Sequence, residues 1–546
     1  MNTTLATNTG RVHQNVPAFD EFSPVSIDNI LHLISSLPPK SCSLDPIPTW
    51  ILKKHSELLA PCITLIINMS FQTCEFPESF KQAEVSPLLK KPSLDVNEFA
   101  NFRPVSNLKF VSKILEKVVA SRLLTHFSEH NLLESYQSAY RKGHSVETAL
   151  TRVSNDIHRA LDRKQAVFLV LLDLSAAFDT IDHSILLTRL EEYGITDGPL
   201  RWMASYLRNR QFSVRVEDKK SSLAPLDCGV PQGSVLGPIL FTIYTAPLGN
   251  IARKYGVSVH QYADDTQLYI PFDPSNQDSE MSARSRLEAC IADMAAWMVT
   301  NKLKLNECKS DFLIISSKFQ KSLIRTRGIT IGDELITPST SVRNLGVTFD
   351  DSMLMEIHVK NVCKSMYFNI HNVSTIRKVL DDKSAAMLIH AFVFSRLDMC
   401  NLLLYKIPDR LTYKLQLALN AAARVLTKTS KYDHITPILE QLHWLPVKQR
   451  IQYKILLLTW KIVHKMAPVY MEELLNLYIP QRSLRSSCQG LFNVPKTRVQ
   501  YGDRAFSVAA PVLWNALPLT LKSIDSVEGF KKHLKTHLFT GTFGSI

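Results

Sequence analysis

The fold of this chain is decided by residues 257–270, VSVHQYADDTQLYI. Two runs rich in β-branched and aromatic residues flank the short connection Ala263-Asp264-Asp265, a pattern that predicts a β-hairpin. Such a hairpin holds two adjacent carboxylates at its bend, where they repel each other unless a cation lies between them. An ordinary solvated turn is the alternative, because Asp is a common turn residue.

Composition narrows the class of protein. The chain has 546 residues, of which 45% are hydrophobic, and this is enough for a substantial folded core. Its 63 Lys and Arg exceed its 50 Asp and Glu, which favours a polyanionic partner. There is no apolar run of about 18 to 20 residues and no apolar core in residues 1–17. We therefore expect a soluble intracellular protein, in the nucleus or the cytoplasm or both, with no membrane contact.

Nine cysteines are scattered along the chain, without a Cys-x-x-Cys pair or a Cys/His cluster at zinc-ligand spacing. The sequence thus predicts neither a disulfide framework nor a zinc knuckle.

The hydrophobic period changes along the chain. Residues 105–165 show mostly helical spacing, whereas residues 166–172, AVFLVLL, form a short apolar block typical of a buried strand that ends at Asp173. A helix is then predicted to begin near Phe178. Helical patterns dominate again from about residue 355, most clearly at 415–426.

Asp173 ends one predicted strand, and the Asp264-Asp265 hairpin follows 91 residues later. If these strands lie side by side, three carboxylates meet at one edge of a sheet. That arrangement suits two Mg²⁺ ions about 3.5 to 4 Å apart, which phosphoryl transfer to a 3′-hydroxyl requires, and Mn²⁺ is a possible substitute.

Three segments resemble motifs A, B and C of reverse transcriptases, in the order expected for that family. They are residues 168–179, FLVLLDLSAAFD, residues 229–238, GVPQGSVLGP, and residues 262–265, YADD. The resemblance implies a mixed α/β (α+β) right-hand polymerase with fingers, palm and thumb.

The resemblance also implies roles for the carboxylates. Asp173 and Asp264 correspond to the metal-binding pair, and Asp265 to the second carboxylate of the hairpin with a weaker role. Leu174 would lend its backbone carbonyl to a metal ion.

Other matching residues imply contacts with the nucleotide. Phe178 corresponds to an aromatic residue that crowds the sugar and excludes a 2′-hydroxyl, although its spacing also fits a helix core. Gln232 and Gly233 correspond to the loop beneath the incoming nucleotide and the template base. The motif at 137–145, QSAYRKGHS, resembles the fingers segment in which Arg141 would contact the triphosphate, with an ordinary surface arginine as the alternative.

Weaker resemblances add further candidates. Arg103, in RPVS at 103–106, matches an earlier fingers motif that touches template or nucleotide. Lys309 corresponds to the motif D lysine that protonates the pyrophosphate leaving group, a role for which Lys302 and Lys304 compete. Residues 344–347, NLGV, resemble the primer grip, a hairpin that supports the primer end, with Leu345 and Gly346 as its candidate residues.

Three polar residues next to motif A could be mistaken for further metal ligands. Asp179, Asp182 and His183 lie where the next helix is predicted to start, so we expect them to cap that helix and offset its dipole.

Segments outside the core resemble LINE-type, non-LTR retrotransposons, and most closely the CR1/L2/Rex-like group. They are SCSLDPIP at 41–48, LHWLPV at 442–447, GDRAFSVAAP at 502–511 and LWN at 513–515. Complete elements of this group carry an endonuclease before the polymerase, and the residues before 45 leave no room for one. The resemblance thus implies a truncated second open reading frame, with the nick for priming supplied by another protein.

The expected organisation has five parts. They are a flexible tail (1–24), a helical N-terminal extension (25–70), fingers and palm (71–349), a helical thumb (350–428), and a mainly helical C-terminal extension (429–546). The last part is rich in Lys, Arg and aromatic residues, and either nucleic-acid binding or a structural cap would explain it.

The leading hypothesis is an RNA-directed DNA polymerase with an RNA template, a DNA primer, dNTPs and Mg²⁺. An inactive or domesticated remnant that binds nucleic acid without polymerising is the alternative. An RNA-dependent RNA polymerase is opposed by Phe178, and an intron maturase by the C-terminal segments. The sequence leaves the oligomeric state open.

Overall fold

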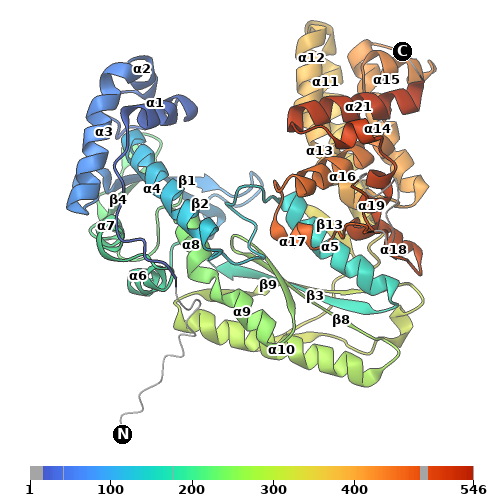
Figure 1. Ribbon diagram of the computed structural model, residues 1–546, viewed down its shortest axis with the longest axis horizontal. Coiled ribbons are helices and arrows are strands. Elements are labelled where there is room, and N and C mark those ends of the chain that lie inside the picture. Colours follow the sequence, from blue (N-terminus) through green and yellow to red (C-terminus); the bar gives the residue numbers. More distant parts are fainter. Residues whose placement is uncertain (1–15, 41, 176–177, 480–489, 545–546) are drawn as a thin grey trace. The chain divides into compact units, whose positions relative to one another are not determined.

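The computed structural model describes residues 16–40, 42–175, 178–479 and 490–544. The chain divides into two compact units, each built from separate stretches of sequence. The first comprises residues 1–140, 174–251 and 293–306, and the second comprises 141–173, 252–292 and 307–546. Both contain helices and sheet, so the predicted mixed α/β class is confirmed (Figure 1).

Unit 1 is built around a sheet with strand order β2-β1-β4-β5, and β6 also pairs with β4. Strand β1 runs antiparallel to β2 and parallel to β4. The strands are β1 (Gln82–Leu89), β2 (Phe102–Asn107), β4 (Gln211–Val216), β5 (Lys219–Lys220) and β6 (Ala224–Pro225). The helices are α1 (Ile27–Ser36), α2 (Thr49–Lys54), α3 (Ser56–Thr73), α4 (Phe110–Glu129), α6 (His183–Glu192), α7 (Asp197–Leu207), α8 (Gly237–Thr245) and α9 (Pro247–Lys254).

The predicted flexible tail lies outside the described residues up to residue 15, and the prediction is wrong for the part that follows. Phe19 donates its N–H to the carbonyl oxygen of Gly194 (2.7 Å), and its own carbonyl accepts the N–H of Thr196 (3.1 Å). The side chain of Phe22 is buried and stacks on Phe71 of α3. Main-chain hydrogen bonds and aromatic burial therefore hold this segment against the rest of unit 1.

The helix after motif A begins later than its hydrophobic spacing predicts. The prediction placed its start near Phe178, but α6 starts at His183 because Asp182 caps it. The Asp182 Oδ1 atom accepts the N–H groups of Ser184 (2.9 Å) and Ile185 (3.1 Å). Capping is thus confirmed for Asp182.

Unit 2 contains a four-stranded sheet with the order β7-β8-β3-β9. Its strands are β7 (Ser258–Tyr262), β8 (Asp265–Phe272), β3 (Ala166–Ser175) and β9 (Lys304–Ile315). The predicted buried strand is confirmed, because Ala166, Val167, Phe168, Leu169 and Val170 are all buried, but it ends at Ser175 rather than at Asp173. Phe168 stacks on Phe272 of β8, with ring centroids 4.1 Å apart. Because both faces of this strand are covered, its residues are apolar throughout and do not alternate with polar ones.

Two further hairpins belong to unit 2, β10 (Ile329–Ile331) with β11 (Glu334–Ile336), and β12 (Ser341–Asn344) with β13 (Val347–Asp350). The helices of this unit are α5 (Val146–Asp162), the first part of α10 (Gln277–Thr300, of which residues 293–300 belong to unit 1), α11 (Glu356–Ile376), α12 (Asp382–Ile389), α13 (Ser395–Leu397), α14 (Asp409–Thr427), α15 (Ile435–Gln441), α16 (Val447–Val463), α17 (Val469–Glu472), α18 (Gln500–Arg504), α19 (Phe506–Asn515), α20 (Leu519–Lys522) and α21 (Val527–Phe543). The helix predicted at 415–426 is confirmed within α14.

Helix α5 joins the sheet to the C-terminal part of the chain. On one side, Asp156 accepts the hydroxyl of Tyr269 from β8 (2.7 Å). On another, Asn155 accepts the N–H of Ser507 (2.9 Å), and Asp162 accepts the N–H groups of Arg498 (2.7 Å) and Val499 (3.1 Å). The C-terminal segment thus supplies main-chain donors to buried side chains of α5.

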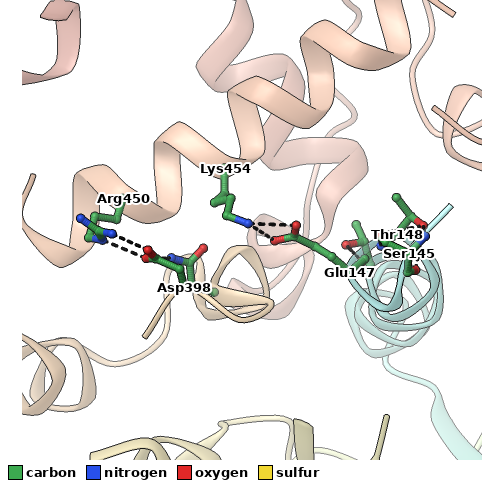
Figure 2. A network of polar contacts seen from close by, with 8 residues as sticks. Ser145, Glu147, Thr148, Asp398, Arg450 and Lys454 are labelled. Carbon is green, nitrogen blue, oxygen red and sulfur yellow. Dashed lines mark hydrogen bonds and ion pairs between the residues drawn. The ribbon is translucent and has the colours of Figure 1, made fainter. Parts of the chain in front are cut away.

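Two positively charged residues one turn apart on α16 form further ion pairs within unit 2 (Figure 2). Lys454 pairs with Glu147 in the first turn of α5 (3.1 Å), and Arg450 donates through Nε to Asp398 (2.9 Å). Residues beyond 429 therefore pack as part of unit 2. No helix in the described part of the chain is long and apolar enough to cross a membrane.

Candidate active site

The carboxylates singled out in motifs A and C meet at one end of the unit 2 sheet. Strands β3 and β8 are antiparallel, and the last pair of their ladder is Leu172 with Thr266. The same register, continued by one residue, sets Asp173 opposite Asp265. Directly opposed residues on neighbouring strands have Cβ atoms about 4.5 to 5.5 Å apart. Asp264 precedes Asp265 in the turn, so all three carboxylates gather there.

The predicted hairpin is confirmed, with one correction to its bend. Tyr262 pairs with Asp265 across the hairpin, so the turn consists of Ala263 and Asp264 alone. Asp265 is already the first residue of β8 rather than part of the turn. Ala263 has φ 56°, in the left-handed region that is unfavourable for a residue with a Cβ atom.

The carboxylates influence one another electrostatically. Partial burial, followed by the negative charges of Asp264 and Asp173, raises the pKa of Asp265 to about 6. Crowded carboxylates of this kind are what a divalent cation would neutralise, and their oxygen atoms are ligands that Mg²⁺ prefers. Among the described residues, no group of three or more His, Cys, Asp or Glu lies close enough to hold a metal ion as it stands.

Lys309 of β9 reaches the same end of the sheet. Its Nζ atom lies 4.0 Å from Oδ2 of Asp173, and two thirds of its side chain is exposed. The residue that follows Asp173, Leu174, has a buried side chain, so only its main chain is available for binding.

A second group of predicted residues lies in unit 1, around the turn that follows β3. Phe178 is half-buried there, and its ring stacks on Phe241 of α8, with centroids 4.6 Å apart and planes inclined by 29°. Because Phe178 precedes α6, the alternative of a helix-core residue is wrong. Its ring is instead held by a neighbouring helix.

The motif B loop contacts the RPVS segment of β2. The carbonyl oxygen of Gln232 accepts the N–H of Ser106 (2.7 Å). Gly233 has φ 111°, and a Cβ atom there would lie 2.8 Å from the Ser106 oxygen, so glycine is required. Arg103 is exposed on the same strand.

Asp179 and His183 do not cap α6, contrary to the prediction. Asp179 accepts the side-chain amide of Gln232, with Nε2 3.0 Å from each carboxylate oxygen. The Nε2 atom of His183 lies 2.8 Å from the carbonyl oxygen of Gly229. The side chains of both residues thus contact the motif B segment instead of capping α6.

The sequence analysis missed Glu116 of α4. Its carboxylate is fully buried and accepts the N–H groups of Val235 (2.8 Å) and Leu236 (3.2 Å), where α8 begins after the motif B loop. Burial raises the pKa of Glu116, and a carboxylate at a helix N-terminus is favourable. Apolar residues surround Glu116 in the sequence, but this pattern alone does not separate a buried acidic residue from one on a helix surface.

The remaining predicted residues lie in unit 2. Arg141 precedes α5, and its carbonyl oxygen accepts the N–H of His144 (3.2 Å). Leu345 and Gly346, with φ 46° and 91°, form the two-residue turn of the β12–β13 hairpin. Next to this turn, Asn344 donates its side-chain amide to Gln267 of β8 (2.7 Å), a buried contact that the sequence analysis also missed.

Comparison with known proteins shows which protein family these residues resemble. Residues 89–349 match the family described as reverse transcriptase (RNA-dependent DNA polymerase). The chain is 26% identical over 446 residues to the probable RNA-directed DNA polymerase from transposon BS of Drosophila melanogaster, covering 78% of this chain and 47% of that protein.

Two further relatives carry similar names. The RNA-directed DNA polymerase from mobile element jockey of Drosophila funebris is 26% identical over 347 residues, covering 62% of this chain and 36% of that protein. The retrovirus-related Pol polyprotein from type-1 retrotransposable element R2 of Nasonia vitripennis is 24% identical over 287 residues, covering 50% of this chain and 26% of that protein. The chain thus spans less than half the length of these relatives.

The matches confirm the resemblance to reverse transcriptases of LINE-type elements, whereas the narrower assignment to the CR1/L2/Rex-like group stays a prediction. The matched residues, 89–349, include motifs A, B and C and both groups of candidate site residues. Residues 89–349 therefore resemble the reverse transcriptases of non-LTR retrotransposons.

Proposed function

We propose that this chain is an RNA-directed DNA polymerase that extends a DNA primer on an RNA template, as in target-primed reverse transcription. The observation that carries the proposal is the register of β3 and β8, which gathers Asp173, Asp264 and Asp265 at one end of the sheet. A reverse transcriptase domain supports the same activity.

Each of the three carboxylates has its own part in binding the metal ions in this proposal. Asp173 and Asp264 would bind both ions, Leu174 would add its carbonyl oxygen, and Asp265 would support the hairpin side with a weaker role. Two Mg²⁺ ions, when bound, supply the positive charge that activates the primer hydroxyl and neutralises the triphosphate. Lys309, whose Nζ atom lies 4.0 Å from Oδ2 of Asp173, would donate a proton to the leaving pyrophosphate.

Residues of the other motifs would bind the nucleotide and the primer. Phe178 would exclude a 2′-hydroxyl with the ring that Phe241 supports. Gln232 and Gly233 would lie beneath the nucleotide, and Arg141 and Arg103 would contact the triphosphate and the template. The turn at Leu345 and Gly346 would support the primer end.

In this proposal, residues 71–349 act as fingers and palm, and residues 350–428 act as the thumb. The C-terminal extension, residues 429–546, is a structural part of the polymerase because it binds α5, the helix that also contacts β8. A nucleic-acid contact on its outer surface is compatible with that packing.

Primer extension on poly(rA)/oligo(dT) tests the proposal. We expect the purified chain to incorporate dTTP with Mg²⁺, and Asp264→Asn to lower kcat on the order of a thousandfold. Asp333→Asn is a matched control, because Asp333 is the second residue of a two-residue turn in the β10–β11 hairpin and is exposed. It should change kcat by less than about twofold.

Absence of Mg²⁺-dependent incorporation by the wild-type chain would refute the polymerase. If that chain still bound the primer–template, the remnant that binds nucleic acid without polymerising would be favoured.

The same assay with rUTP in place of dTTP tests the sugar gate. Phe178→Ala should raise the relative use of rUTP on the order of tenfold or more, because the ring no longer crowds the 2′ position. Equal use of both nucleotides by the wild-type chain would contradict the role given to Phe178.

A further inference from the structure

Asp179 makes a contact that neither the motif match nor its place in the chain explains. It lies in the turn after β3, and its carboxylate faces the side chain of Gln232, 53 residues away. Gln232 Nε2 is 3.0 Å from both Oδ1 and Oδ2. Such a charge-assisted pair is stronger than a hydrogen bond between neutral groups.

The main chains of the two segments are already joined without this pair. Val230 donates its N–H to the carbonyl oxygen of Phe178 (3.0 Å), and Gly229 donates to that of Ile181 (2.8 Å). A Cβ atom on Gly229 would lie 2.9 Å from the Cα atom of Asp179, so the backbones touch. The backbone contacts alone therefore hold the motif B loop in place. The Asp179–Gln232 pair is not needed for that and instead orients the side chain of Gln232.

An ionised carboxylate only accepts hydrogen bonds, whereas a glutamine amide has a donor end and an acceptor end. Asp179 therefore fixes the amide with Nε2 toward itself, and the Oε1 atom of Gln232 faces away. Without Asp179, rotation by 180° about the last side-chain bond would exchange the two ends.

We propose that Asp179 is a positioning residue that presents the Gln232 carbonyl oxygen to a hydrogen-bond donor of the incoming deoxynucleotide. This inference rests on the proposed function, since it gives the nucleotide as the ligand of Gln232. Asp179 itself touches neither the nucleotide nor the metal ions in this scheme.

The test combines dTTP kinetics with equilibrium binding of dTTP to the full chain on a primer–template with a chain-terminated primer. Asp179→Ala should raise both KM and Kd for dTTP about tenfold, the effect of one lost charge-assisted hydrogen bond, with kcat changed by less than about threefold. Asp179→Asn should restore much of the affinity, because its amide oxygen still accepts from Nε2. Asp182→Asn is the matched control, since it removes a carboxylate charge three residues away, keeps an oxygen atom that can cap α6, and should leave KM unchanged.

A double-mutant cycle separates positioning from a general structural role. In the Gln232→Ala background, Asp179→Ala should have no further effect on KM or Kd. An equal loss in both backgrounds, or an unchanged KM in the single variant, would overturn the inference.

Measuring dTTP binding separately from dTTP incorporation distinguishes a failure of this inference from a failure of the polymerase proposal. If the wild-type chain bound dTTP without incorporating it, the polymerase proposal would fail and the binding cycle would still decide the role of Asp179. If it bound no dTTP, both proposals would fail.

Discussion

The β7–β8 and β10–β11 hairpins share a plan and differ in their turn residues. Ala263-Asp264 forms the two-residue turn of the first, and Gly332-Asp333 that of the second. The first turn residue is left-handed in both, with φ 56° at Ala263 and 58° at Gly332. Glycine adopts this conformation without penalty, whereas a residue with a Cβ atom loses about 1–2 kcal/mol there.

Because Ala263 rather than glycine adopts this conformation, the β7–β8 turn has backbone strain next to Asp264 and Asp265. The β10–β11 turn follows ordinary turn chemistry, and its exposed Asp333 has no predicted role. The β7–β8 turn departs from that chemistry at the residue before Asp264. Strained backbone persists where the surrounding structure holds it, and such places are common at active sites. An alanine has fewer accessible conformations than a glycine, and it therefore restricts Asp264 more closely.

The largest expected contrast between the hairpins concerns the acidic residue after each turn. Asp265→Asn removes the carboxylate opposite Asp173, whereas Glu334→Gln removes the equivalent one in β11. We expect the first change to lower kcat about 10- to 100-fold and to raise the Mg²⁺ concentration needed for half-maximal rate. The second should alter neither.

A Mg²⁺ titration of primer extension measures both variants. An unchanged Mg²⁺ requirement in Asp265→Asn would show that the metal site needs only Asp173 and Asp264.

Sequence patterns predicted the parts of this site that depend on near neighbours. The buried strand that carries Asp173 and the YADD hairpin both follow from residues within about ten positions, although the strand continues to Ser175. The β12–β13 hairpin agrees with the hairpin implied by the resemblance of residues 344–347 to the primer grip. The helix after motif A began at His183 rather than near Phe178, because its cap decided its start and not its hydrophobic spacing.

Contacts between distant residues could not be predicted in this way. Asp179 and Gln232 are 53 residues apart, and Glu116 and Val235 are 119 apart. Only the folded backbone brings these groups together. A buried acidic residue such as Glu116 is indistinguishable by local pattern from one that lies on a helix surface.

The second contrast between the hairpins is their response to acid. His260 of β7 is fully buried against the ring of Tyr470, whereas the buried residues of β10 are Ile329 and Ile331. Burial, followed by the charges of Arg152 and His144, lowers the pKa of His260 from 6.5 to about 3. The imidazole is thus neutral in the folded chain over the ordinary pH range.

The unfolded chain binds a proton at this histidine below pH 6.5, and the folded chain does not. The contribution of the neutral His260 to the free energy of unfolding is therefore fully present above pH 6.5 and is lost as the pH falls toward 3. At pH 5 the loss from His260 alone is about 2 kcal/mol. In urea unfolding at pH 7 and pH 5, His260→Gln should show a smaller decrease than the wild-type chain. An equal decrease would mean that His260 is protonated in the folded state.

The smallest contrast concerns the turn residues themselves. Ala263→Gly should raise the free energy of unfolding by about 1 kcal/mol, because the strain at φ 56° is relieved. Gly332→Ala should lower it by about as much, since it creates the same strain and its Cβ atom would displace the carboxylate of Glu307. Urea unfolding measures both changes.

If the strain at Ala263 serves catalysis, the more stable variant must be the slower enzyme. Ala263→Gly widens the conformations open to Asp264, so we expect kcat to fall about threefold to tenfold although stability rises. Gly332→Ala should lower stability and leave kcat unchanged. A gain in both stability and kcat for Ala263→Gly would show that the strain at Ala263 does not serve catalysis. The turn residues of the two hairpins would then differ in sequence without a difference in function.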